Sequence, residues 1–328
     1  MLRSMFSGVA GLRAHQVKMD VVANNISNVN TYGYKTSRIA FSEMYSQTLK
    51  PASGAAASGL MGGVNPQQIG LGVQTASIDV IHTQGATQTT DRGLDMMING
   101  EGFFVVREGA DIFYTRAGNM YMDEYGYLTN ADGMYLQGIM LLEDFAERQD
   151  DVAVEEAITE KWDNDADNIL PQGMTPEELL EDGTFPLEID PESEDLLLEA
   201  SVPVGRIVIP PWYKNISIGQ DGLIQAENEL GELVNVAYVM TATFSNPGGL
   251  DRVGSNLYRD TANSGSPAFC PPGVGTSGTV TVGAVEMSNV DLSKEFTEMI
   301  ITQRGFQSNS RIITVSDTLL EELVNLKR

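Results

Sequence analysis

The chain has 328 residues, with 45 acidic and 20 basic side chains, a formal net charge of −25, one cysteine and two histidines. Because this charge repels phosphate, it argues against binding to nucleic acid and to an anionic membrane surface. A single cysteine with two histidines cannot form an intramolecular disulfide or a Cys/His zinc site.

The first 15 residues have an apolar core that is too weak for a cleaved secretory signal. Nowhere does an apolar run approach the ~18 residues that a membrane helix needs. We therefore expect no membrane insertion and no cleaved signal peptide. By these rules the protein is cytoplasmic, although an export route without a cleaved signal would escape the test.

The N-terminal segment has a helical pattern. Seven positions are spaced alternately four and three residues apart, as in the a/d positions of a heptad: Met5, Val9, Leu12, Gln16, Met19, Ala23 and Ile26. The segment that follows is rich in residues that favour turns, namely Asn24, Asn25, Asn28, Thr31 and Gly33. The pattern predicts an amphipathic helix over about residues 5–26 that ends in a tight turn.

The central part of the chain is rich in strand signals. Residues 50–75 are rich in Gly, Ala, Ser and Gln, which predicts a flexible or irregular connection. Residues 103–106 form a short apolar run, and the Asp-Gly pairs at 132–133 and 221–222 predict hairpins. We expect residues 36–142 and 204–284 to form one β-rich domain.

The negative charge is concentrated between these two parts. Residues 143–199 carry 21 acidic and two basic side chains, which is −19 of the total charge. The segment from Asp163 begins like a calcium-binding loop, but Asn168 replaces the glycine and Met174 replaces the glutamate that such a loop needs. We therefore expect residues 143–203 to form an inserted acidic outer domain that contains β-structure and a solvated acidic loop.

The C-terminal segment repeats the heptad spacing without a break over about 35 residues. The positions are Leu292, Phe296, Met299, Gln303, Phe306, Ser310, Ile313, Asp317, Leu320 and Val324. Ser288 and Asp291 have capping-box spacing just before this pattern. The spacing predicts a helix of roughly 50 Å.

These elements predict an α+β fold whose N- and C-terminal helices, in residues 1–35 and 285–328, pair as a coiled coil around a looped-out β-rich middle. Polar residues interrupt the predicted seam, so the two helices alone bury little apolar surface. We expect them to be loose in a single chain and to become ordered when neighbouring chains cover them. The predicted subunit-interface residues are Met5, Val9, Leu12, Met19, Ala23, Ile26, Leu292, Phe296, Met299, Phe306, Ile313, Leu320 and Val324.

No group of residues predicts catalysis, and we expect no cofactor and no metal. His15 and His82 have no nucleophile or acid that pairs with them in the sequence pattern, so we interpret both as structural. The glycines at 70 and 72 do not continue as a dinucleotide-binding fingerprint, since position 75 is threonine. We interpret Cys270 as a lone, inert thiol. A secreted binding or enzymatic β-protein with helical ends remains the alternative class.

Both ends of the chain resemble a known family. The stretch SGVAGLRAHQVKMDVVANNISNVNTYGYK at residues 7–35 resembles the N-terminal signature of bacterial flagellar rod and hook proteins, and residues 286–328 resemble their C-terminal signature. The likeness extends more loosely to GLDMMINGEGFFVV at 93–106. Residues 41–44, 288–292 and 323–328 resemble hook members most, and the insert at 143–203 also favours a hook member over the shorter distal rod members.

The resemblance implies a structural subunit, not an enzyme, whose terminal helices form the inner tube of a helical homopolymer. The expected location is the flagellum, outside the cell, reached through the flagellar type III export apparatus without a cleaved signal. The implied partners are copies of the chain itself, the distal rod protein, the hook cap protein, the hook–filament junction protein and that export apparatus. The hook that these subunits form is a flexible universal joint. The alternative within the family is the distal rod subunit.

Overall fold

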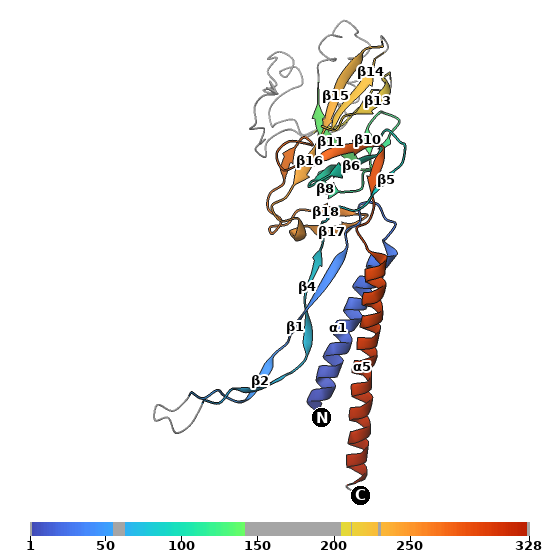
Figure 1. The fold of residues 1–328 in the computed structure, drawn as a ribbon. Helices are drawn as coiled ribbons and strands as arrows, with labels where there is room; N and C mark the ends of the chain where they lie inside the picture. Colours follow the sequence, from blue (N-terminus) through green and yellow to red (C-terminus); the bar gives the residue numbers. More distant parts are fainter. Residues whose placement is uncertain (1, 55–62, 142–204, 211, 229–230, 327–328) are drawn as a thin grey trace. The chain divides into compact units, whose positions relative to one another are not determined.

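The computed structural model describes residues 2–54, 63–141, 205–210, 212–228 and 231–326 (Figure 1). The acidic segment, with its predicted loop and outer domain, lies outside these residues. The described residues form two compact units. One unit holds residues 1–30, 35–83 and 288–328, and the other holds residues 31–34 and 84–287. The structure thus groups residues 35–83 with the terminal helices, whereas the sequence analysis assigned residues 36–142 to the β-rich domain. The predicted domain boundaries stay a prediction.

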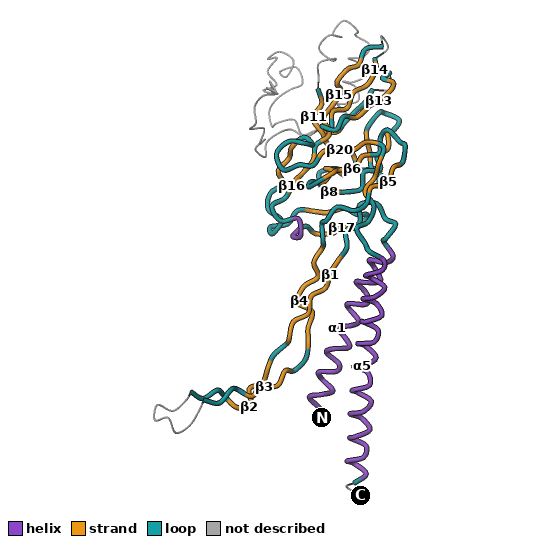
Figure 2. Tube along the Cα trace, viewed as in Figure 1, coloured by secondary structure: helices purple, strands orange, loops and turns teal. Residues whose placement is uncertain are grey.

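The helical unit consists of two long helices and a two-stranded ribbon (Figures 1 and 2). Helix α1 spans Leu2–Ser27 and helix α5 spans Leu292–Asn325. Strands β1 (Ser37–Glu43) and β4 (Val73–Val80) pair antiparallel, and β2 (Ser46–Lys50) and β3 (Gln67–Gly70) continue the ribbon. None of the helices in the described ranges is long and apolar enough to cross a membrane.

The ribbon corrects part of the prediction of an irregular connection over residues 50–75, because residues 67–70 and 73–75 lie in strands. Within that range β3 pairs with β2, and β4 begins at Val73. Strands β2 and β3 are almost wholly exposed and mostly polar, so the alternating apolar pattern of a half-buried strand is absent from them. Backbone hydrogen bonds between two strands need no apolar side chains, and composition alone therefore missed the pairing.

The start of α5 also differs from the expected capping box. Asp291, not Ser288, is the N-cap, and its Oδ1 accepts hydrogen bonds from the backbone N–H groups of Ser293 at 2.9 Å and Lys294 at 3.3 Å. These bonds satisfy two N–H groups that have no partner within the helix. The Ser288 hydroxyl instead accepts from the Val290 N–H, one turn before the helix.

Thirteen of the described strands in the other unit form one antiparallel sheet. Its main path runs β13–β14–β15–β11–β7–β8–β18–β17. These strands are β13 (Lys214–Ile218), β14 (Leu223–Glu227), β15 (Leu233–Val239), β11 (Tyr135–Met140), β7 (Phe103–Glu108), β8 (Asp111–Thr115), β18 (Leu257–Arg259) and β17 (Asp251–Gly254). The sheet joins strands from both sides of the acidic segment, because β11 pairs with β15 and with β12 (Gly205–Arg206).

The remaining strands lie beside this path. Strands β9 (Tyr121–Met122), β10 (Leu128–Thr129), β16 (Thr241–Thr243) and β19 (Ala268–Cys270) join the same sheet, and η1 (Pro247–Gly249) is a short 3-10 helix. Two further pairs are β6 (Met96–Asn99) with β20 (Thr279–Val282), and β5 (Thr87–Thr89) with β21 (Ala284–Glu286). Both predicted Asp-Gly hairpins form, with Gly133 and Gly222 at positive φ, where glycine is favoured.

Strand β7 lies at the centre of the core. Its successive side chains point to opposite faces of the sheet and are buried on both. Phe104 and Val106 belong to the larger apolar cluster, while Phe103 and Val105 belong to a second cluster with Tyr258. The short apolar run that predicted this strand is therefore explained by burial on two sides.

Candidate functional site

The two terminal helices pack side by side through small and polar residues. A Cβ on Gly8 would lie 3.5 Å from Ile313 Cγ1, which is ordinary contact. A Cβ on Gly305 would lie only 2.6 Å from the ring of His15. The Lys18 ammonium pairs with the Glu298 carboxylate at 2.5 Å. We call the residues in these contacts the contact row: Gly8, Gly11, His15, Lys18 and Asn25 on α1, with Glu295, Glu298, Gly305, Asn309, Ile312 and Ile313 on α5.

The contact row has the heptad spacing that the sequence predicts, but it is displaced by one residue on both helices. On α1 it falls on 8, 11, 15, 18 and 25, and the same spacing includes the buried Val22. On α5 it falls on 295, 298, 305, 309 and 312, with the buried Thr302 and Ser316 in step. Of the predicted positions, Ile313 lies in the row itself, against Gly8, and the others lie beside the row or away from it. Small and polar residues form the closest contact because they allow the two backbones to approach, and an apolar pattern does not reveal them.

Many apolar side chains of the helix pair are exposed as a consequence. Their exposed fractions range from 37% to 82%: Phe6, Val9, Leu292, Phe296, Ile300, Ile301, Phe306, Ile312, Val315, Leu319, Leu323, Val324 and Leu326. Among the predicted interface residues, Ala23 is also exposed, while Met5, Leu12, Met19, Ile26, Met299, Ile313 and Leu320 are half-buried. That these residues contact neighbouring subunits stays a prediction.

Two asparagines tie the helix ends to the ribbon, and we call them the asparagine joint: Asn25 and Asn289. The Asn25 side chain accepts from the Ser37 N–H at 3.0 Å and donates to the Ser37 carbonyl at 2.9 Å, and it also donates to Glu295 Oε2. Asn289 Oδ1 accepts from the N–H and hydroxyl of Thr36, and its Nδ2 donates to the carbonyls of Ile81 and Thr83. The end of α1, both strands of the ribbon and the start of α5 are thereby fixed together.

The predicted turn residues have different roles. Asn25 is buried in the joint, whereas Asn28 makes exposed hydrogen bonds to Asn24. Gly33 has φ +67°, and a Cβ there would lie 2.6 Å from the Ala117 backbone nitrogen. Only glycine fits such a position without strain. The Thr31 carbonyl accepts from the Tyr34 N–H, which closes the turn.

Protonation of His15 opposes the contact between the two helices. Its ring lies against Gly305 and makes an edge-on contact with Phe41, with ring centroids 6.2 Å apart. Burial lowers the pKa of His15, and the positive charge of Lys18 lowers it further. The neutral imidazole is therefore the form that suits the paired helices.

A buried ion pair holds together one end of the β unit. The Arg116 guanidinium and the Glu286 carboxylate are 3.4 Å apart, and both side chains are at most 5% exposed. Glu286 Oε1 also accepts from the Gly85 N–H at 2.7 Å, and Arg116 donates to the Gly100 carbonyl at 2.8 Å. The Glu286 backbone carbonyl accepts from the Gly33 N–H, so this pair also anchors the turn after α1. Sequence analysis missed the pair, because the two residues lie 170 positions apart without a motif.

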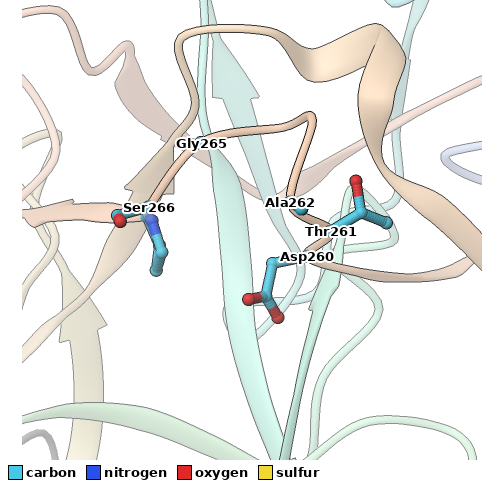
Figure 3. A pocket seen from close by; sticks show the side chains of 6 residues that line it. Asp260, Thr261, Ala262, Gly265 and Ser266 are labelled. Carbon is cyan, nitrogen blue, oxygen red and sulfur yellow. The ribbon is translucent and has the colours of Figure 1, made fainter.

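The described residues offer little that resembles catalytic chemistry. No group of three metal-ligating side chains gathers among them. Cys270 is buried, which raises the pKa of its thiol, and His82 lies in the connection after β4 and not in a strand. A shallow pocket of about 330 Å³ is lined by the polar loop from Asp260 to Pro267 (Figure 3). Asp260 supplies its one charged lining side chain.

The chain matches three protein-family models. Residues 97–226 match the flagellar hook protein FlgE/F/G D1 domain, and residues 281–326 match the C-terminal region of flagellar basal body rod FlgEFG proteins. Residues 5–35 match the flagella basal body rod protein model. These matches fall on part of the β unit, on α5 and on most of α1 in turn.

Similar proteins have the same family names. The flagellar basal-body rod protein FlgG of Bacillus subtilis (strain 168) is 40% identical over 329 residues, with 100% of both chains covered. The flagellar hook protein FlgE of Borreliella burgdorferi is 32% identical over 443 residues, and that of Treponema pallidum is 29% identical over 465 residues, again with full coverage of both chains. The chain therefore belongs to the family of flagellar hook and rod structural proteins.

Proposed function

We propose that this chain is a structural subunit that assembles with copies of itself into the tube of the flagellar hook. The observation that carries the proposal is the arrangement of the helix pair. The contact between α1 and α5 uses mainly small and polar residues, while Phe296, Ile300 and Ile301 are at least half exposed. A soluble single chain gains nothing from exposed apolar rows on two long helices, whereas neighbouring copies can cover them.

The free energy gained by burying the exposed apolar side chains supports assembly through these helices. Fully burying one large apolar side chain contributes about 1.5–3 kcal/mol. Association of two proteins costs about 4–15 kcal/mol of lost translational and rotational freedom. A single contact of one or two such residues is thus too weak, but each copy in a tube touches several neighbours at once. The exposed rows therefore favour a polymer over a dimer.

The choice between hook and rod rests on different observations. The hook relatives of Borreliella burgdorferi and Treponema pallidum support the hook, as does the likeness of residues 41–44, 288–292 and 323–328 to hook members. The distal rod is the second candidate, because the rod protein of Bacillus subtilis is 40% identical and both chains are covered completely in an alignment of 329 residues. We propose the hook, with its flexible joint between motor and filament, on the likeness of these end segments to hook members; the charged insert does not discriminate, because the Bacillus subtilis rod protein matches the chain over its whole length.

Electron microscopy of polymers assembled from the purified full chain tests this proposal. Curved, flexible tubes are expected for a hook subunit. Short, straight tubes would identify a rod subunit and contradict the hook. A chain that stays monomeric at high concentration would contradict both proposals. The same images locate the acidic segment, which we propose at the outer surface, where its charge keeps neighbouring tubes apart.

A variant without residues 143–200 tests the place of the insert. We propose that this variant still forms tubes, because the helical unit lies elsewhere in the chain. A folded variant that does not polymerise would contradict the peripheral position. The proposed partners beyond the chain itself are the distal rod protein, the cap protein, the hook–filament junction protein and the export apparatus, and the location is the flagellum outside the cell.

A further inference from the structure

We propose that the last turns of α5 dock against the first half of α1 in a second copy of the chain. This inference rests on the proposed self-assembly and names one of its contacts. The docking surface is formed by three residues that we call the leucine patch: Leu319, Leu323 and Leu326. They are 46%, 49% and 82% exposed.

The leucine patch continues the contact row of α5. The row reaches Ile312 opposite Gly8 and the buried Ser316, and the same alternating spacing then falls on 319, 323 and 326. Where α1 covers this face, most positions of the row are small or polar, such as Glu295, Gly305 and Asn309, and Ile312 and Ile313 are the apolar exceptions. Past Ser316 every position of the row is leucine. The side chains on one continuous face thus change character along the helix.

The change coincides with the place where α1 begins. Helix α5 extends past the start of α1 at Leu2, as Figure 1 shows for this pair. The contacts run antiparallel, since His15 lies opposite Gly305 and Gly8 opposite Ile312 and Ile313. The leucine patch therefore lies on the stretch of α5 that its own α1 does not cover.

The first half of α1 in a second copy matches this surface. Phe6 is 71% exposed and Val9 is 37% exposed, so α1 presents an apolar strip one turn from its start. A second α1 laid antiparallel along the end of α5 would contact the leucine patch through Phe6 and Val9, and its Gly8 and Gly11 would stay against its own α5. The antiparallel orientation would also place the positive N-terminal end of one helix near the negative C-terminal end of the other.

The charged residues around the two surfaces are opposite in sign. Arg3 and Arg13 flank Phe6 and Val9 on α1, and both are exposed. Asp317, Glu321 and Glu322 accompany the leucine patch on α5, and they are exposed too. Lys327 and Arg328 follow in the sequence, beyond the described residues. These charges favour the antiparallel orientation at close range and are screened by salt.

Disulfide cross-linking between copies tests the contact directly. In a Cys270→Ser background, which removes the single native cysteine, one chain carries Phe6→Cys and the other carries Leu323→Cys. The two chains are mixed, assembled and oxidised. We expect a linked dimer in the polymer and little in the monomer, because a disulfide forms only when the Cα atoms approach within about 7 Å.

In the matched control, the second chain carries Ser308→Cys in place of Leu323→Cys. Ser308 is exposed on the same helix but lies outside the row. Tubes in which Phe6→Cys links to Leu323→Cys no better than to Ser308→Cys would overturn the inference while leaving self-assembly intact. A wild-type chain that forms no tubes at all would instead overturn the proposed function.

A second variant measures the contribution of the patch without cross-linking. Leu319, Leu323 and Leu326 are changed together to serine, which leaves the contacts of Gly8, Gly11 and His15 untouched. We expect the critical concentration for polymerisation to rise roughly tenfold or more, because the apolar area that assembly buries is reduced. An unchanged critical concentration would overturn the proposed docking.

Discussion

Asn25 on α1 and Glu295 on α5 lie 270 positions apart in the chain, and the Asn25 amide donates to the Glu295 carboxylate at 3.2 Å. The same amide group also bonds both backbone groups of Ser37. One buried side chain thus connects the end of the first helix, the start of the ribbon and the start of the last helix. The two terminal helices are held together at this end of the pair by polar contacts.

Replacing Asn25 by alanine should loosen all three connections. Buried polar groups that lose their partners cost about 1–3 kcal/mol each, so we expect Asn25→Ala to lower the free energy of unfolding of the helical unit by about 2–4 kcal/mol. Hydrogen exchange of the α1 amides is the measurement. Asn28→Ala is the matched control, because the Asn28 side chain bonds to Asn24 in an exposed position. Equal effects of the two changes would argue against the joint.

Glycines in the contact row should respond to alanine in opposite directions. Gly8→Ala meets only ordinary contacts, so the better helix propensity should stabilise α1 by up to about 1 kcal/mol. Gly305→Ala would press on the His15 ring at 2.6 Å and should destabilise the pair by about 1–3 kcal/mol. Thermal unfolding followed by circular dichroism separates the two. A stabilising Gly305→Ala would mean that the helices do not pack as described.

The helix pair should weaken in mild acid. Burial and Lys18 lower the pKa of His15 in the folded chain, so the unfolded chain takes up the proton first. Stability from this group is present above its ordinary pKa of about 6.5 and is lost as the pH falls below that value. Helical hydrogen exchange measured at pH 7.5 and 5.5 should show the loss, and His15→Gln should remove most of the difference. If His15→Gln shows the same pH response as the original chain, other titratable groups cause the loss of stability.

The buried ion pair of the β unit should be far more sensitive than an exposed one. Glu286→Gln leaves the Arg116 charge buried without its partner, which should cost about 3–5 kcal/mol in urea unfolding. The matched control is Asp79→Asn, which removes an exposed pair with Arg38 at 3.6 Å and should change stability by less than about 1 kcal/mol. Comparable losses in the two variants would contradict the structural role of Glu286.

A charge on the α1-facing side of α5 should disrupt the pairing of the two helices, whereas a charge on its exposed side should disrupt only assembly between copies. Ile313 lies against Gly8, so Ile313→Asp should cost about 2 kcal/mol or more in the single chain and abolish tubes. Ile300 is 54% exposed, so Ile300→Asp should leave the helical circular dichroism of the monomer unchanged and still block tubes. Pelleting by ultracentrifugation measures assembly. Normal tubes from Ile313→Asp would refute the helix pairing. Normal tubes from Ile300→Asp would show that the exposed face of α5 around Ile300 does not contact neighbouring copies.

The period of both helices could be predicted from the sequence, but the phase of their contact could not. Apolar residues recur in heptad spacing, and the search for a seam therefore selected positions such as Val9 and Phe296. The contact itself falls one residue earlier, on Gly8 and Glu295, because small side chains and hydrogen bonds set the closest approach. An apolar pattern marks every helix face that becomes buried. It does not show whether the other terminal helix or a neighbouring chain buries that face.

Local signals fared better than long-range ones in the β unit. The Asp-Gly pairs predicted two hairpins, since their glycines adopt the positive φ that such turns need. The pairing of β2 with β3 was missed because its strands are exposed and polar. Arg116 and Glu286 could not be linked either, because nothing in the spacing of single residues reports a contact across 170 positions.

The structure of the assembled tube at side-chain detail, determined by electron cryomicroscopy, tests the central claim most directly. The account predicts that α1 and α5 of neighbouring copies form the wall of the tube, with Phe296 and Ile300 buried between copies and Gly8 still against Ile313 within each copy. A tube in which Phe296 and Ile300 remain exposed to solvent, with contacts between copies made only by the β units, would contradict it.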